Sequence, residues 1–180
     1  PEAAALNVEV AMTGYAEQSA RYWFDQSVKA QMDYTDAYVN ILRAYNPRWG
    51  GDYASMIAFG KECLDTERFD TEVPCKYLEA LLQIMDEDKE AWQSVLKVPG
   101  VYGNLQRLFR GYSEIADDVM VRDRNLSGLL VVAWVNKDYE TAHALSQQLN
   151  EAFTPVPFHR YALRKDDVLR DIQAWAIRQK

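Results

Sequence analysis

The sequence predicts an all-α fold, built as a stack of antiparallel helical hairpins with about nine helices. Apolar residues recur at the spacing of one α-helix face in segments along the whole chain. Runs that alternate apolar and polar residues, as a half-buried strand does, never exceed a few positions. Short clusters of Pro, Gly, Asn and Asp separate the segments, and short connections favour antiparallel neighbours. Residues 1–180 are expected to form a single domain.

Four helices are expected in the first half of the chain. Apolar positions mark them at residues 16–28, 38–45, 52–64 and 74–85. The second ends at residues 46–51, where Pro47 and two glycines break the helix and permit a sharp turn. Asp52 is a good N-cap for the third helix. The polar stretch 65–72 is expected to be a loop, and Pro74 fits the first turn of the fourth helix.

Five further helices are expected in the second half. Apolar positions mark them at residues 92–96, 105–112, 126–134, 142–153 and 168–176. Turn residues separate these segments at Pro99-Gly100, at Asn136-Lys137-Asp138 and at residues 154–157, which contain two prolines. The charged residues 86–90 form a corner before the first of the five.

Small and aromatic residues follow a pattern in the first half that resembles a tetratricopeptide repeat. The positions that match are Ala20, Phe24, Ser27, Ala37 and Tyr38. In such a repeat the small residues let paired helices approach closely, and the aromatic residue fills the gap between hairpins. Met32 stands where the family usually has proline, and residues 137–142 are similar to the turn and second-helix start of another repeat. The resemblance implies an irregular tetratricopeptide-like stack.

Residues 46–51 read Asn-Pro-Arg-Trp-Gly-Gly and follow a Tyr-rich helix. They resemble a bacterial family of uncharacterised domains marked by a Pro-Arg-Trp-Gly-Gly turn between tetratricopeptide-like helices. Asp52 stands where that family usually has serine, and an aspartate caps a helix equally well. The resemblance implies the same fold and a bacterial source. It implies no activity, because the family has none established.

The charge of the chain is acidic and unevenly distributed. The formal net charge is −7 and the isoelectric point is about 4.9. Residues 157–180 carry six Lys/Arg and three Asp, which fits a mildly basic terminal helix on an acidic body. Nucleic-acid-binding proteins normally present a basic patch, so the composition argues against that partner and favours a basic protein or peptide. The longest apolar run, residues 129–135, is too short to span a membrane.

The two cysteines, Cys63 and Cys75, permit two interpretations. They lie near the end of one expected helix and the start of the next, so antiparallel packing would bring them together and allow a disulfide in an exported protein. The alternative is a pair of small buried thiols. The sequence begins at Pro1, so we expect that an upstream segment was removed. Both a cytoplasmic and a periplasmic or secreted location therefore stay open, the latter favoured if the cysteines are bonded.

The most distinctive candidate site lies at the 46–51 turn. Trp49 offers a flat face and Arg48 a planar fork for a carboxylate or a peptide carbonyl, and Tyr45 and Tyr53 would complete an aromatic wall that binds a partner. The alternative is structural: Trp49 plugs the end of the hairpin and Arg48 caps the carbonyls of a helix end. The two glycines beside Trp49 suit a tight helix corner and favour this alternative.

No catalytic residue, metal or cofactor is predicted. Adjacent carboxylates on a helix point in different directions and show no calcium-loop spacing, so the acidic clusters are interpreted as solvated helix ends. His143 and His159 have no nucleophile motif near them, and no phosphate-binding glycine loop is present in the sequence. The acidic clusters are Asp86, Glu87, Asp88 and Glu90, and Asp117 with Asp118.

These patterns favour a non-catalytic scaffold that binds a protein or peptide on the surface of stacked hairpins. The alternative is a small-ligand-binding or acid–base enzyme domain with a groove near Arg48 and Trp49. A third interpretation is a purely structural segment of a longer protein.

Overall fold

A computed structural model describes residues 1–87, 95, 96 and 98–179. Within these residues the protein has ten α-helices and one 3-10 helix, and no strand. The prediction of an all-α stack of hairpin-like neighbours is confirmed. Asp88, Glu90 and the short helix expected at residues 92–96 lie wholly or mostly outside the described residues.

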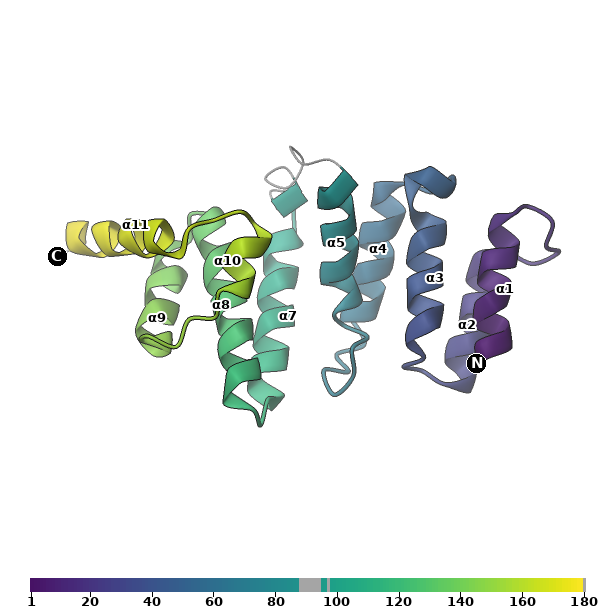
Figure 1. Ribbon diagram of the computed structural model, residues 1–180, viewed down its shortest axis with the longest axis horizontal. Helices are drawn as coiled ribbons and strands as arrows, with labels where there is room; N and C mark the ends of the chain where they lie inside the picture. The colour runs from purple at the N-terminus through teal and green to yellow at the C-terminus, as the bar shows by residue number, and fades with distance from the viewer. Residues whose placement is uncertain (88–94, 97, 180) are drawn as a thin grey trace. The chain divides into compact units, whose positions relative to one another are not determined.

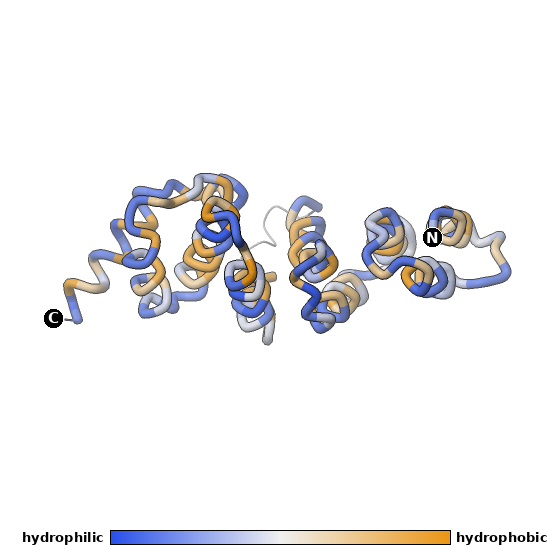
Figure 2. Tube along the Cα trace, turned by 90° about the horizontal axis from the view of Figure 1, so that it is seen from below, coloured by the Kyte–Doolittle hydropathy of each residue, from blue (hydrophilic) through white to orange (hydrophobic). Residues whose placement is uncertain are grey.

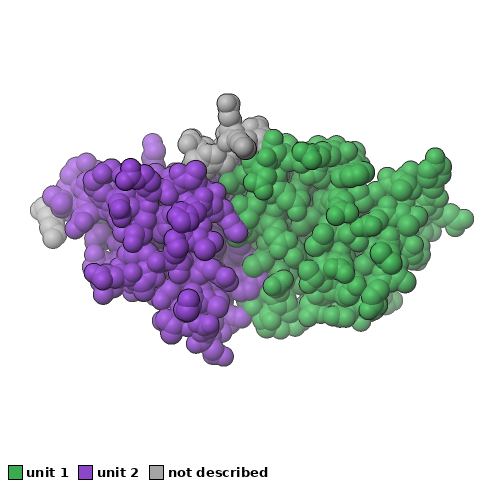
Figure 3. All heavy atoms as spheres, viewed as in Figure 1, with its two compact units in different colours: residues 1–87 green, residues 88–180 purple. Residues whose placement is uncertain are grey.

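The chain is grouped into two compact units, Pro1–Glu87 (unit 1) and Asp88–Lys180 (unit 2), which Figure 3 colours separately. Each unit is described by itself below. The single domain expected from the sequence stays a prediction.

Unit 1 holds five α-helices and the 3-10 helix. Helix α1 packs on both α2 and α3, α3 packs on α4, and α4 packs on α5. Within this unit α1 and α3 lie in front of α2 and α4 in Figure 1. The helices are α1 (Glu2–Met12), α2 (Ala20–Ala30), α3 (Thr35–Tyr45), η1 (Pro47–Trp49), α4 (Tyr53–Leu64) and α5 (Lys76–Glu87).

The helix starts in unit 1 follow from capping side chains. The hydroxyl oxygen of Ser19 accepts a hydrogen bond from the Tyr22 amide at 3.1 Å and sets the start of α2. Ala16, expected on the face of this helix, therefore lies in the preceding turn. Asp52 caps α4 as expected, through the Ser55 amide at 2.7 Å. Helix α1 was not among the nine expected helices.

An aromatic cluster forms the centre of unit 1. Phe24 makes edge-to-face contacts with Tyr38 and Phe59, each with ring centroids 5.1 Å apart. Ser27 and Ala37 are near Phe24 and Tyr38 in the sequence, and both are fully buried. Their small side chains suit the close approach of paired helices that the repeat-like pattern predicts. The pattern at these positions is thus built into the packing of α2, α3 and α4.

Unit 2 is arranged around helix α8, whose stretch from Leu126 to Ala133 is buried throughout. Helices α7, α9 and α10 pack on α8, and α11 packs mainly on α9. Figure 2 shows hydrophobic and hydrophilic residues side by side on the helices of each unit. The helices are α7 (Val101–Ile115), α8 (Val119–Val135), α9 (Tyr139–Leu149), α10 (Val156–Arg160) and α11 (Lys165–Arg178).

The helices of unit 2 differ from the prediction in their bounds, and α10 begins at Val156 within the break expected at residues 154–157. Helix α8 begins at Val119 because Asp118 caps it, its carboxylate accepting from the Met120 amide at 2.7 Å. Helix α9 ends at Leu149, since Asn150 has a φ of 50° and leaves the helical region, so Phe153 lies beyond it. No described helix is long and apolar enough to cross a membrane.

Asp138 joins two helices of unit 2. Its carboxylate caps α9 through the Thr141 amide at 3.1 Å and accepts a 2.6 Å hydrogen bond from the Tyr102 hydroxyl on α7. Partial burial opposes ionisation of Asp138, but the hydrogen bonds from Tyr102 and Thr141 outweigh it and lower its pKa. Burial, together with the neighbouring carboxylate, raises the pKa of Tyr102.

Candidate functional site

The corner between α3 and α4 is organised by Asn46. Its side-chain oxygen accepts from the Arg48 amide at 2.9 Å, and its side-chain nitrogen donates to Glu87 Oε1 at 3.2 Å. Its carbonyl accepts from the amides of Trp49 and Gly51 at 2.9 and 3.2 Å. The Asn46 residue is only 8% exposed. A buried amide with these partners fixes the path of the turn.

The four residues predicted to form a binding surface at this corner are divided between different roles. The Tyr45 ring lies 5.6 Å from the Phe59 ring and belongs to the aromatic cluster. Arg48 Nε pairs with Glu87 Oε1 at 3.0 Å, so it does not cap helix-end carbonyls through this nitrogen. Trp49 is 60% exposed and Tyr53 37%, so Trp49 does not plug the hairpin. A carboxylate ligand at Arg48 would have to compete with Glu87.

An ion pair that the sequence analysis did not anticipate links α2 to α4. Arg21 donates two parallel hydrogen bonds to the Glu62 carboxylate at 2.7 and 2.9 Å, and a third to Asp25 at 2.8 Å. The contact with Glu62 raises the pKa of Arg21, and the hydrogen bonds from Arg21 lower the pKa of Glu62.

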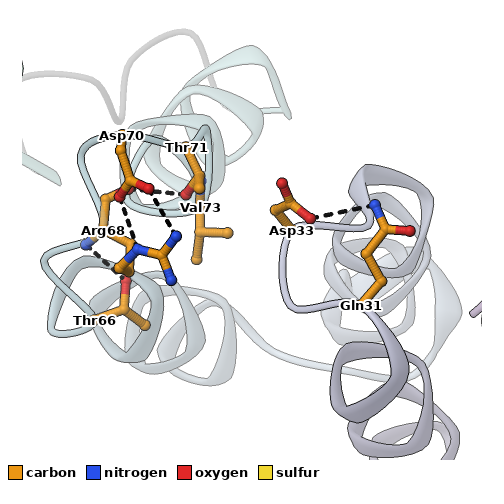
Figure 4. A network of polar contacts seen from close by, with 7 residues as sticks. All are labelled: Gln31, Asp33, Thr66, Arg68, Asp70, Thr71 and Val73. Carbon is orange, nitrogen blue, oxygen red and sulfur yellow. Dashed lines mark hydrogen bonds and ion pairs between the residues drawn. The ribbon is translucent and has the colours of Figure 1, made fainter.

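The loop between α4 and α5 is ordered by its own polar side chains, as Figure 4 shows. Arg68 makes two 2.7 Å hydrogen bonds to the carboxylate of Asp70. The Arg68 pKa is raised chiefly by this contact. On the α2–α3 turn, Gln31 donates to Asp33 at 3.2 Å. These contacts lie among neighbours in sequence and stabilise the turns; they do not assemble a catalytic group.

Cys63 and Cys75 are thiols in the structure, and the disulfide that the sequence permits is not formed between these two described residues. Cys63 is buried and Cys75 half-buried. Burial raises the pKa of the Cys63 thiol to about 12, so it is a poor nucleophile at neutral pH. The alternative of two buried thiols fits Cys63 and only in part the half-buried Cys75.

The acidic clusters and histidines have separate surroundings. Asp117 and Asp118 are exposed, and Asp118 caps α8 as described above. His159 is exposed on α10, whereas the half-buried His143 on α9 lies beside Trp175 with ring centroids 6.1 Å apart. In the part of the chain that the structure describes, no group of three or more His, Cys, Asp or Glu side chains is placed to hold a metal ion.

A groove of about 250 Å³ lies between α1 and α3 in unit 1. Asn40 donates to the Ala5 carbonyl at 3.0 Å, and Arg43 donates to Glu9 at 3.0 Å. Because residue 40 pairs with residue 5 and residue 43 with residue 9, the two helices run in the same direction. The lining residues are Glu2, Ala5, Leu6, Glu9, Tyr34, Asp36, Val39 and Asn40. We call this the α1–α3 groove.

Apolar and acidic side chains both line the α1–α3 groove. Leu6 on α1 is 62% exposed and Val39 on α3 is 41% exposed. Three carboxylates line the same groove: Glu2 and Glu9 on α1, and Asp36 on α3. Arg43 lies beside them and is paired with Glu9.

Unit 1 as a whole is strongly acidic. It contains seven Lys or Arg and fifteen Asp or Glu, a net charge of −8, whereas unit 2 contains thirteen and twelve, a net charge of +1. The acidity that the sequence assigned to the chain therefore belongs to the unit that carries the α1–α3 groove. A field of this sign attracts basic ligands.

Compared with protein-family models, with curated proteins and with solved structures, the chain matches none of them.

None of the residues that line the α1–α3 groove was singled out in the sequence. A signal was present, because Leu6 follows Glu2 by four positions and precedes Glu9 by three, which places an apolar residue between two acidic ones on a helix surface. Asp36 and Val39 on α3 could be connected with these α1 residues only once the packing of α1 on α3 was known.

Proposed function

We propose that this protein is a non-catalytic helical scaffold that binds a basic amphipathic helix of another protein in the α1–α3 groove. The observation that carries the proposal is the exposure of Leu6 and Val39 between the carboxylates of Glu2, Glu9 and Asp36. A groove lined by apolar and acidic side chains is complementary to a helix that has apolar residues on one face and Lys or Arg beside them.

The form of the groove supports a helix as the ligand. On α1, the exposed residues Leu6 and Val10 are four positions apart and form a ridge on one face of the helix. Ridges of this spacing pack into the grooves of another helix. The resemblance of the chain to tetratricopeptide repeats, which favours peptide binding by stacked hairpins, supports the same role.

Isothermal titration calorimetry with a synthetic 14-residue Leu/Lys peptide, designed as an amphipathic helix, tests the proposal on the full chain. We expect saturable one-to-one binding that weakens as salt is added, since screening acts on the carboxylates of the groove. A peptide in which Ala replaces every Leu keeps the charge and should bind at least roughly tenfold more weakly, because the apolar contacts are lost.

The matched variants are Leu6→Lys and Tyr15→Lys. Tyr15 is 93% exposed and also belongs to unit 1, so both variants add one positive charge to the same unit at a solvated position. Leu6→Lys should abolish binding and Tyr15→Lys should change it little. Equal effects of the two substitutions would show that the peptide responds only to net charge, and the proposed groove would be wrong.

A further inference from the structure

Unit 2 contains a second and larger groove, between α9 and α11, with a volume of about 730 Å³. On the α9 side the lining residues run from His143 through the end of the helix at Leu149 to Glu151, and on α11 they run from Leu169 to Ile177. The α11 wall therefore extends over eight residue steps, about 12 Å at the rise of an α-helix. We call this the α9–α11 groove.

The α9–α11 groove combines an apolar base with side-chain amides. Ile172 is buried, and Leu169, Ala176 and Phe153 are half-buried along it. The exposed amides come from both sides, with Gln147 and Asn150 from the α9 side and Gln173 from α11. Each amide offers a donor pair and an acceptor, which is the same set of groups that a peptide bond requires.

The groove is nearly neutral. Glu151 is the single carboxylate among the residues that line it, all of which lie in the described part of the chain, and no Lys or Arg lines it. Lys165 lies nearby, with its amino group 5.8 Å from the centre of the Phe153 ring. The charge pattern thus differs from that of the α1–α3 groove, and electrostatic attraction gives no preference for a basic ligand here.

We propose that the α9–α11 groove is a second binding site, which takes an uncharged, extended peptide segment. The amides of Gln147 and Gln173 hold its backbone from the two walls, and its apolar side chains contact Leu169, Ile172 and Ile177. Ile177 is 68% exposed, and the bound peptide removes part of its side chain from water. At about 3.3 Å per residue, a 12 Å wall accommodates about four extended residues.

An extended strand satisfies this groove better than a helix does. A helix has its backbone groups bonded internally and presents only side chains, so the amides of Gln147 and Gln173 would find no backbone partner. An extended chain leaves its N–H and C=O groups open, and these pair with side-chain amides directly. The size of the groove also lies within the range of ordinary ligand sites, about 300–1,000 Å³.

The test is a selection of random 12-residue peptides displayed on phage against the full chain in 0.5 M NaCl, which suppresses binding to the acidic α1–α3 groove. The strongest peptide is then synthesised and titrated by fluorescence anisotropy. We expect it to be rich in uncharged residues, and its Kd to change less than about twofold between 0.1 and 0.5 M NaCl.

Two amide substitutions and a matched control locate the binding. Gln147→Ala with Gln173→Ala removes the amides from both walls at exposed positions and should weaken binding roughly tenfold or more. Gln148→Ala changes an exposed glutamine of the same helix that does not line the groove and should leave the Kd unchanged. Gln147→Glu keeps the shape but removes the donor, so a loss of affinity here identifies the hydrogen bond and not the apolar contact.

The inference is overturned if the selection yields no peptide with a Kd below 1 mM, if the double variant binds as well as the wild type, or if Leu6→Lys weakens the selected peptide as much as the double variant does. The last outcome would assign the peptide to unit 1. Failure of the Leu/Lys peptide in unit 1 leaves these measurements unaffected, because the two sites differ in position and in salt dependence.

Discussion

At the α3–α4 corner, Asn46 holds the chain while Trp49 points to solvent. Replacing Asn46 by Ala keeps the hydrogen bonds from the Trp49 and Gly51 amides to the residue 46 carbonyl. It removes both side-chain hydrogen bonds and leaves the Arg48 amide without its acceptor. We expect Asn46→Ala to lower the free energy of unfolding by about 2 kcal/mol. Trp49→Ala should lower it by less than about 1 kcal/mol, because most of its side chain is already hydrated. Urea unfolding followed by circular dichroism measures both.

A larger loss for Trp49→Ala than for Asn46→Ala would contradict this account and restore the structural plug that the sequence suggested. Arg48→Ala gives an internal comparison. It removes an ion pair whose arginine is 73% exposed, so its effect should be within about 1 kcal/mol.

The Arg21–Glu62 pair makes stability depend on pH in a defined direction. Because the arginine lowers the pKa of Glu62 in the folded state, the pair stabilises the protein above the ordinary pKa of about 4.5, and this contribution is lost as the pH falls through the folded pKa. We expect Glu62→Gln to be less stable than the wild type at pH 7, by up to about 1 kcal/mol because Glu62 is 55% exposed. The difference should shrink as the pH is lowered below about 4.5.

Thermal unfolding of both proteins at pH 7, 5 and 3 measures this difference. Glu72→Gln is the control, since Glu72 is exposed and lies in the α4–α5 loop. A Glu62→Gln effect that is the same at all three pH values would exclude the ion pair as its cause.

The sequence predicted some residues of unit 1 well and others not at all. Phe24, Ser27, Ala37 and Tyr38 are buried where the repeat-like pattern expects small and aromatic packing residues, because such packing is local to one hairpin. Arg21 and Glu62 lie 41 positions apart, and no pattern along the chain connects them. Asn46 could only be noted as the residue before a proline, since its partners include Glu87 on another helix.

At the scale of the helix, the breaks and caps were predictable because they depend on neighbours in sequence. Asp52 caps α4, and residues 65–72 form a loop between α4 and α5, both as expected. Helix α1 was missed because its exposed face carries Leu6 and Val10 instead of polar residues, so the contrast between two faces that reveals a surface helix is weak.

The close packing of α4 on α5 depends on Gly60. A Cβ atom at this position would lie 2.9 Å from the Cα atom of Tyr77, and backbone cannot move aside as a flexible side chain can. We expect Gly60→Ala to lower the free energy of unfolding by about 1–3 kcal/mol, although alanine is the better helix former. Chemical denaturation measures the change.

Gly103 in helix α7 is the matched control. A Cβ atom there would meet nothing within 4 Å, so Gly103→Ala should be neutral or stabilise the protein by up to about 1 kcal/mol. If the two substitutions changed stability in the same direction, helix propensity and not the α4–α5 approach would determine the effect.

For the whole molecule, the net charge could be read from the sequence, but its division between the two units could not. Residues 157–180 could be recognised as basic, yet the division near residue 87 appears only when the helices are assembled into units. The two compact units then carry net charges of −8 and +1. The same partition explains why the two proposed sites, one in each unit, should answer differently to salt.

The charge of unit 1 also predicts how salt affects its own stability. Fifteen carboxylates and seven cations repel one another on balance within this unit, whereas the charges of unit 2 nearly cancel. Raising NaCl from 0.1 to 1 M shortens the screening length from about 10 to about 3 Å and removes most of that repulsion. Amide hydrogen exchange of the full chain, read by mass spectrometry, should therefore slow in α1–α5 by roughly two- to fivefold relative to α7–α11.

Unit 2 is the internal control, because general effects of NaCl on apolar surface act on both units. Surface ion pairs such as Arg21–Glu62 weaken in salt and oppose the change. Equal slowing in both units would show that the weakened pairs offset the relieved repulsion, and faster exchange in α1–α5 would show that they outweigh it.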